Sequence, residues 1–240
     1  MNIGQAMAVT LNRQDTFDGT KSGIPDDPGR QQEIVDAFHK HYFAHTNTLI
    51  FWGGYPALKC PMDMWMYQEI MYLTLPEVIV ECGTMFGGSA LFLANVYDMM
   101  GNGEVITIDI QKRTAIFPDM PKHPRISYIL GDSTDPEVVA AITEHVAGRS
   151  VMVILDSDHR QEHVAKELEA YAPLVKPGHY LIVEDTNLNG HPVAQGWGAG
   201  PMEAVRDFLA RHPEFECDRS RERFWLTFNP GGYLKRKEVA

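Results

Sequence analysis

Long apolar stretches and cysteine pairs are both missing from this chain of 240 residues. No run reaches the roughly 18 apolar residues that a membrane helix needs, and the first residues lack the basic and apolar segments of an export signal. We therefore expect a cytoplasmic protein with no membrane partner. The cysteines form no Cys-x-x-Cys pair for zinc or redox chemistry, which favours reduced, buried thiols. They are Cys60, Cys82 and Cys217.

Positive charge is also in short supply. The chain has 21 Lys and Arg against 32 Asp and Glu, which gives a formal net charge of -11 at pH 7. Proteins that bind nucleic acids normally present a basic face to the phosphates, so we expect no nucleic-acid partner. With 44% hydrophobic residues, the composition is that of an ordinary globular protein, long enough to form one domain with a sizeable core.

The chain changes character twice along its length. Residues 1–30 are polar and rich in Gly, Asp and Pro, which predicts a flexible arm. Residues 31–240 are expected to form a single domain. Within it, residues 31–76 would be a helical segment on the side of the substrate that accepts a group, and residues 77–235 would be the core that binds the cofactor. Aromatic residues in the N-terminal segment could pack on a second subunit, so we expect a homo-oligomer.

From Glu77 onward, short apolar runs alternate with amphipathic stretches, the pattern of βαβ units with a mostly parallel sheet. The last two apolar runs are separated only by RSRE, which is too short for a crossover helix and predicts an antiparallel hairpin. Five parallel strands with helices on both faces and this hairpin form the Rossmann-like α/β sheet of class I methyltransferases. The expected strands are 78–82, 104–110, 126–130, 151–156, 180–185, 215–218 and 223–228. A first helix is expected to begin near Gln31. Further helices are expected at 62–75, 88–100, 135–147, 160–175 and 201–211.

Ligands of open α/β sheets bind beyond the carboxyl ends of the strands, so the residues that finish each strand are the informative ones. The first strand runs into ECGTMFGGS, where glycines let the backbone come close to a ligand. Its spacing differs from the G-x-G-x-x-G of dinucleotide enzymes, and the cofactor expected for this fold is S-adenosyl-L-methionine. Asp109 would accept hydrogen bonds from the ribose hydroxyls and Asp132 from the adenine amine. The expected cofactor residues are Glu81, Gly83, Thr84, Gly88, Ser89, Asp109, Asp132, Ser133 and Asp156.

Several of these positions have alternative explanations. Acids and serines just before a helix often cap it, and for Ser133 and Asp135 capping is the favoured interpretation. His163, on the helix after the fourth strand, is expected at the surface. A nicotinamide cofactor would also place an acid at Asp109, so this residue alone does not exclude an oxidoreductase. A second alternative is a non-catalytic scaffold that binds S-adenosylmethionine, which the joint presence of cofactor acids and further acids disfavours.

Four carboxylates follow the fourth and fifth strands. Asp156 and Asp158 come after the fourth, just before His159, while Glu184 and Asp185 end the fifth. If the two strands are neighbours, these carboxylates meet, and so much negative charge is costly unless a cation compensates it. Hard oxygen ligands suit Mg²⁺, or Mn²⁺ or Ca²⁺, rather than zinc. Such a metal would activate a hydroxyl of the acceptor, and a spare acid or imidazole would take its proton.

The chain resembles the cephalosporin hydroxylase / rhamnosyl O-methyltransferase family over about residues 50–235. The motifs that carry the resemblance are PEVIVECGTMFGGSALFLA, ITIDI, ILGDS, ILDSDH and HYLIVEDTNLNGHPV. The resemblance implies a metal-dependent O-methyltransferase of a small molecule, such as a rhamnosyl or other deoxysugar group in natural product biosynthesis. It also implies a metal site formed by the acid after the fourth strand and the pair after the fifth. On this sequence we assign Asp156 as a ligand, Asp158 as a ligand or the base, His159 as a second catalytic candidate, and Glu184 and Asp185 as ligands.

The acceptor side is expected around the stretch NLNGHPVAQGWGAG after the fifth strand. Its length and glycines are typical of a lid that orders on binding. His191 and Trp197 in this stretch are expected to act on the acceptor, His191 as a catalytic residue. Trp52, Tyr55 and Trp65 could form apolar walls, but for Trp65, which lies at helical spacing with Met62 and Ile70, a place in the core is the favoured interpretation. A phenolic or carboxylic acceptor is the alternative to a sugar.

Overall fold

The computed structural model describes residues 27–46, 50–111 and 119–238. By its internal contacts the chain divides into two units, residues 1–38 and residues 39–240. The expected flexible arm lies outside the described residues except for its last four positions, of which three already belong to helix α2 (Pro28–His45). Within the part of the chain that is described, no helix is long and apolar enough to cross a membrane.

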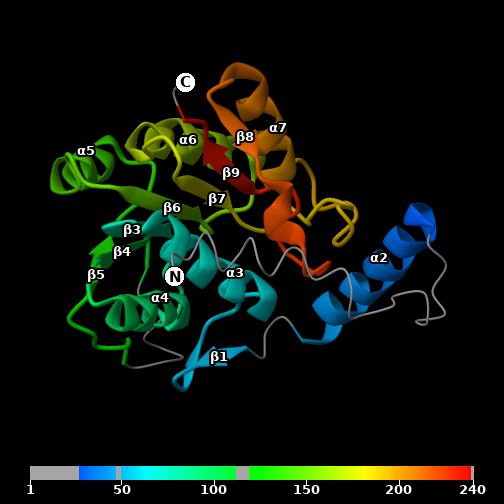
Figure 1. Cartoon of the computed structure of the whole chain (residues 1–240), viewed down its shortest axis with the longest axis horizontal. Coiled ribbons are helices and arrows are strands. Elements are labelled where there is room, and N and C mark those ends of the chain that lie inside the picture. Colours follow the sequence, from blue (N-terminus) through cyan, green and yellow to red (C-terminus); the bar gives the residue numbers. More distant parts are fainter. Residues whose placement is uncertain (1–26, 47–49, 112–118, 239–240) are drawn as a thin grey trace, which may run out of the picture. The chain divides into compact units, whose positions relative to one another are not determined.

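A seven-stranded sheet forms the centre of the second unit, in the order β5-β4-β3-β6-β7-β9-β8 (Figure 1). The first five strands of this order are parallel, and β9 and β8 are antiparallel additions at one edge. The fold is therefore the predicted class I methyltransferase sheet, and all five parallel strands lie within two residues of their predicted ends. They are β3 (Val78–Cys82), β4 (Glu104–Asp109), β5 (Ile126–Leu130), β6 (Val151–Leu155) and β7 (Tyr180–Val183).

Helices cover both faces of the sheet, as predicted. Alternate residues of the buried strands point to opposite faces, so Val78 and Val80 pack in one apolar cluster and Ile79 in the other. The first cluster includes residues of α5 (Pro136–His145), α6 (Gln161–Tyr171) and α7 (Pro201–Arg211). The second includes residues of α3 (Pro61–Thr74) and α4 (Gly88–Met100). The strands β1 (Phe51–Trp52) and β2 (Tyr55–Pro56) lie before α3 and pair as a hairpin. The short 3₁₀ helix η2 (Ala172–Leu174) follows α6.

The second arm of the final hairpin was predicted wrongly. Strand β8 (Phe215–Cys217) pairs with β9 (Tyr233–Arg236) and not with residues 223–228, and a 3₁₀ turn, η3 (Arg219–Glu222), follows β8. Only the second half of residues 223–228 is buried, and there Leu226 and Phe228 pack into a small cluster with Cys60. The N–H of Phe228 donates to the Asp63 side chain at Oδ2, at 2.8 Å, and the Phe228 carbonyl accepts from the N–H of Asn187 at 3.1 Å.

Candidate cofactor and metal site

The turn after β3 is held against the end of β6. Gly83 has φ +100°, and a Cβ at this position would lie 1.9 Å from the carbonyl oxygen of Asp156. The sequence predicted that a glycine here lets the backbone approach a ligand. The close approach in the structure is to the backbone of the neighbouring strand end. Gly88 is similar, since its Cβ would lie 2.3 Å from the carbonyl oxygen of Pro56. Both glycines thus bring separate segments together at the carboxyl edge of the sheet.

Glu81 is a fully buried carboxylate beneath this turn. Its Oε2 accepts a hydrogen bond from Thr107 Oγ1 at 2.7 Å, and Thr107 Oγ1 lies 2.7 Å from Thr84 Oγ1. Burial raises the pKa of Glu81, and the positive charge of Lys59 opposes that shift. Its Oε1 is buried and has no partner with hydrogen-bond geometry among the described residues. Glu81 Oε1 is therefore the carboxyl oxygen left for a ligand at the position where the sequence predicted a cofactor contact.

Asp109 ends β4 beside the same turn. Its Oδ2 accepts from the N–H of Met85 at 2.9 Å, and its Oδ1 from the N–H of Gln111 at 3.1 Å. A cavity of about 550 Å³ opens here, within the size range of small-ligand sites. Among its lining residues are Thr84, Met85, Asp109, Gln111, Tyr128 and Leu130.

Asp132 and Ser133 occupy the loop after β5 but have different surroundings. Asp132 is exposed and accepts from the N–H and hydroxyl of Thr134, as in an Asx turn. Ser133 is buried and donates to Glu167 Oε1 at 2.5 Å, so its hydroxyl does not cap α5. That cap is Asp135, as predicted. His163 is partly buried, not fully at the surface, with Nε2 3.4 Å from Glu167 Oε1.

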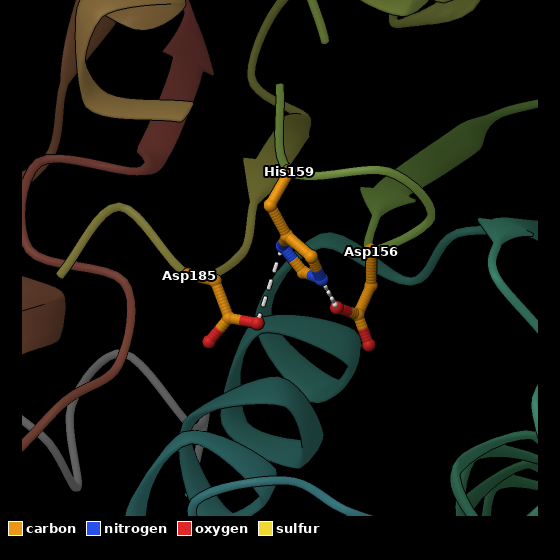
Figure 2. A group of neighbouring side chains, drawn as sticks. All are labelled: Asp156, His159 and Asp185. Carbon is orange, nitrogen blue, oxygen red and sulfur yellow. Dashed lines mark ion pairs between the residues drawn. The ribbon is translucent and has the colours of Figure 1, made fainter. Parts of the chain in front are cut away.

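Three side chains that follow β6 and β7 form a group that could hold a metal. The candidate ligand atoms of Asp156, His159 and Asp185 all lie within 4.8 Å of one another. Figure 2 shows the His159 ring between the two carboxylates, with Nδ1 3.3 Å from Asp185 Oδ2 and Nε2 4.0 Å from Asp156 Oδ1. Two predicted metal residues, Asp158 and Glu184, are not in this group, although Glu184 directly precedes Asp185.

Asp185 adopts an uncommon backbone conformation at this site. Its φ is +53°, and its N–H donates to Asn229 Oδ1 at 3.1 Å. Asn229 is itself buried, and its Nδ2 donates to Tyr67 Oη at 2.8 Å. Burial raises the pKa of Asp185 to about 6, while the neighbouring His159 acts to lower it. The position of this carboxylate is thus set by a hydrogen-bonded chain that reaches α3.

Lys59 is a functional candidate that the sequence analysis missed. It lies between β2 and α3, is 2% exposed, and its ammonium contacts Asp156 Oδ2 and, at 2.6 Å, Glu184 Oε1. Burial alone would lower the Lys59 pKa, but the two carboxylates more than offset this and raise it. In turn, burial and Asp156 raise the pKa of Glu184, and Lys59 opposes that shift. The only sequence signal was one lysine within the apolar run PALKCP.

Asp158 and His191 face other partners. Asp158 pairs with Arg160, whose hydrogen bonds lower the Asp158 pKa to about 2 despite some burial. A carboxylate with such a low pKa is a weak base at neutral pH. His191 Nε2 lies 2.9 Å from Glu203 Oε1 on α7, so its ring is engaged within the loop and helix that follow β7.

The aromatic residues expected on the acceptor side are spread over two regions. Trp197 lies beside the candidate metal site: its ring is in edge contact with His159, and the residue is 52% exposed. Trp52 packs edge-on against Phe92 and donates to Asn95 Oδ1. Trp65 was expected in the core, and this was wrong, since it is 59% exposed. Helical spacing did not reveal which face of α3 is buried.

The chemistry of these side chains fits a divalent cation and a cofactor rich in hydrogen-bond donors. Carboxylate oxygens from Asp156 and Asp185 are the ligands that Mg²⁺ prefers. Buried or partly buried acceptors on Glu81 and Asp109 suit an ammonium group and ribose hydroxyls. Both sets lie at the carboxyl edge of the sheet, joined through the contact of Gly83 with the Asp156 backbone.

Comparisons with known proteins found a matching family model, relatives similar in sequence and solved structures with a similar fold. A family model described as rhamnosyl O-methyltransferase/CmcI matches residues 44–237. A rhamnosyl O-methyltransferase of Mycobacterium leprae is 39% identical over 212 residues, which is 85% of this chain and 91% of that protein. Among solved structures, an apo form of CmcI superposes with a TM-score of 0.59 at 21% identity, covering 80% of this chain and 78% of that one. A CmcI structure with Mg and SAM has a TM-score of 0.58 at 21% identity, covering 83% and 84%. At such identities these structures support the fold alone.

Proposed function

From the premise that this chain belongs to the rhamnosyl O-methyltransferase/CmcI family, we propose that it methylates a sugar hydroxyl with the help of a divalent cation. As a member of this family it is an S-adenosylmethionine-dependent O-methyltransferase. The proposed acceptor is a rhamnosyl or related deoxysugar group of a glycosylated small molecule. The relative from Mycobacterium leprae carries that acceptor in its name, and the two chains match over most of their lengths.

One observation carries the proposal: Asp156, His159 and Asp185 meet at the sheet edge that also holds the cofactor residues. In class I sheets this edge is where ligands bind, so a cation here would lie close to the methyl donor. We propose that Asp156, Glu184 and Asp185 would hold the cation, because Mg²⁺ prefers carboxylate oxygens to imidazole nitrogen. A cation held by these residues would ease the deprotonation of the acceptor hydroxyl.

His159 is the proposed base. Its ring lies between Asp156 and Asp185, and Asp185 Oδ2 is 3.3 Å from Nδ1, so a proton taken up on the ring would be stabilised by a carboxylate. Asp158 is disfavoured for this role because it is paired with Arg160. On the cofactor side, Asp109 would accept from the ribose hydroxyls and Glu81 from the methionine ammonium group.

The test is transfer of a labelled methyl group from S-adenosylmethionine to a rhamnosyl glycoside, compared with the free aglycone phenol. We expect methylation of the sugar only, its loss in EDTA, and its return with Mg²⁺. Methylation of the phenol alone would replace the sugar acceptor with the phenolic alternative. Full activity in EDTA would refute the cation.

A further inference from the structure

A buried ammonium group lies inside the acidic cluster, a place that few lysines occupy in proteins. Lys59 approaches from the segment between β2 and α3, and its side chain is 2% exposed. Its two carboxylate partners come from neighbouring parallel strands. Asp156 follows β6 and Glu184 follows β7, and the N–H of Glu184 donates to the carbonyl of Leu155 at 2.9 Å. Lys59 thus links the two strand ends on which the proposed metal site depends.

The two oxygens of Asp156 serve different neighbours. Oδ2 contacts Lys59, whereas Oδ1 is the atom nearest His159, at 4.0 Å from Nε2. Because Lys59 holds one oxygen, rotation of the carboxylate is restricted, and the other oxygen stays on the side where His159 and Asp185 lie. The side chain that fixes this orientation is not itself a ligand of a cation.

We propose that Lys59 is a permanent counter-charge and positioning residue of the acidic cluster. It neutralises one of the negative charges of Asp156, Glu184 and Asp185, and it keeps the first two in place before a metal arrives. The negative charge that remains in the cluster is then left for a divalent cation to balance. The identity of that cation rests on the proposed function. The role of Lys59 in the metal-free protein is independent of it.

The physical reason is the cost of an unpaired buried charge. Removing one partner of a buried ion pair leaves the other without compensation, which is strongly destabilising, whereas removing both partners is often neutral. In Lys59→Met the buried carboxylates would lose their counter-charge while the side chain keeps a similar length. Adding Glu184→Gln to that variant removes one of the unpaired charges again. The stability of the double variant therefore separates a role in charge compensation from a role in packing.

The experiment compares four proteins in EDTA at pH 8: wild type, Lys59→Met, Glu184→Gln and the double variant. Lys176→Met, at an exposed lysine whose ammonium donates to the Gly148 carbonyl, is the matched control. We expect Lys59→Met to lower the Tm by roughly 10 °C, the control to change it little, and the double variant to recover at least half of the loss. Mg²⁺ should then raise the Tm of Lys59→Met by more than that of wild type, since it supplies the missing positive charge.

Two results would overturn the role of Lys59: a Tm of Lys59→Met in EDTA equal to that of wild type, or a double variant no more stable than Lys59→Met. If Lys59→Met does not fold, a folded double variant still supports the proposal, and an unfolded one overturns it. A wild-type protein whose Tm does not respond to Mg²⁺, and which gives no heat of Mg²⁺ binding, would refute the proposed cation instead. The comparison in EDTA would still decide the role of Lys59.

Discussion

Asp156 and His159 have different neighbours from Asp158, which lies between them in the sequence. Asp156 and His159 face the Asp185 carboxylate, while Asp158 faces the exposed guanidinium of Arg160. The motif ILDSDH showed that chemistry was concentrated here but not which acid points inward. That choice depends on the turn after β6, where Asp158 accepts the N–H of Arg160. Local hydrogen bonding of this kind is not visible in residue types alone.

His159→Asn should lower kcat about 10²–10⁴-fold and leave the affinity for S-adenosylmethionine nearly unchanged, because the side chain acts on the acceptor proton. Asp158→Asn is the matched control, and its activity should stay within about threefold of wild type, since exposed ion pairs contribute little. Steady-state kinetics and calorimetry of cofactor binding measure both. A larger loss for Asp158→Asn than for His159→Asn would reverse the assignment of the base.

At the scale of elements, the sequence predicted the parallel sheet closely but the C-terminal segment poorly. Buried parallel strands are continuous apolar runs, so β3 could be placed with both ends correct and β6 with an error of one residue at its end. The run at 223–228 is also largely apolar, yet its first three residues are exposed, and the buried Thr227 and Phe228 are hydrogen-bonded to Asp63, more than 160 residues earlier in the chain. The same limit applies to Lys59, whose partners lie 97 and 125 residues away. Contacts over such separations need the folded topology.

Asp63 joins α3 to this C-terminal segment and gives a test at the same scale. It accepts hydrogen bonds from Thr227 Oγ1, Tyr233 Oη and the Phe228 N–H. Burial raises its pKa from 3.8 to about 6, although these hydrogen bonds act to lower it. The folded state therefore binds the proton more tightly than the unfolded state. This contribution to stability is complete below pH 3.8 and is lost as the pH rises through about 6.

We therefore expect wild type to be more stable than Asp63→Ala at both pH 4.5 and pH 7, because three donors lose their acceptor. The difference in unfolding free energy should be about 2 kcal/mol larger at pH 4.5 than at pH 7. Urea unfolding of both proteins at the two pH values measures it. A difference that grows with pH would mean that Asp63 has a lowered pKa and is held as a carboxylate.

For the molecule as a whole, cofactor and cation should stabilise the fold independently. The residues proposed for the cofactor are Glu81 and Asp109, and those proposed for the cation are Asp156, Glu184 and Asp185. Saturation near 100 times the dissociation constant contributes about 2.7 kcal/mol, which corresponds to a rise in Tm of roughly 5–10 °C for each ligand. In thermal melts, EDTA should remove the increment from Mg²⁺ and leave that from S-adenosylmethionine. If EDTA also removes the cofactor increment, the cation is part of the cofactor site.

Glu167 connects loops that otherwise belong to different strands. From α6, its Oε1 accepts the hydroxyl of Ser133 after β5 and, at 2.6 Å, that of Ser157 after β6. One carboxylate thus anchors both loops, and a loop that moves away loses its hydrogen bond to Glu167. In native-state hydrogen exchange, the amides of the two loops should be deprotected together, with one opening free energy. Glu167→Ala should separate this cooperative unit into two loops that open independently.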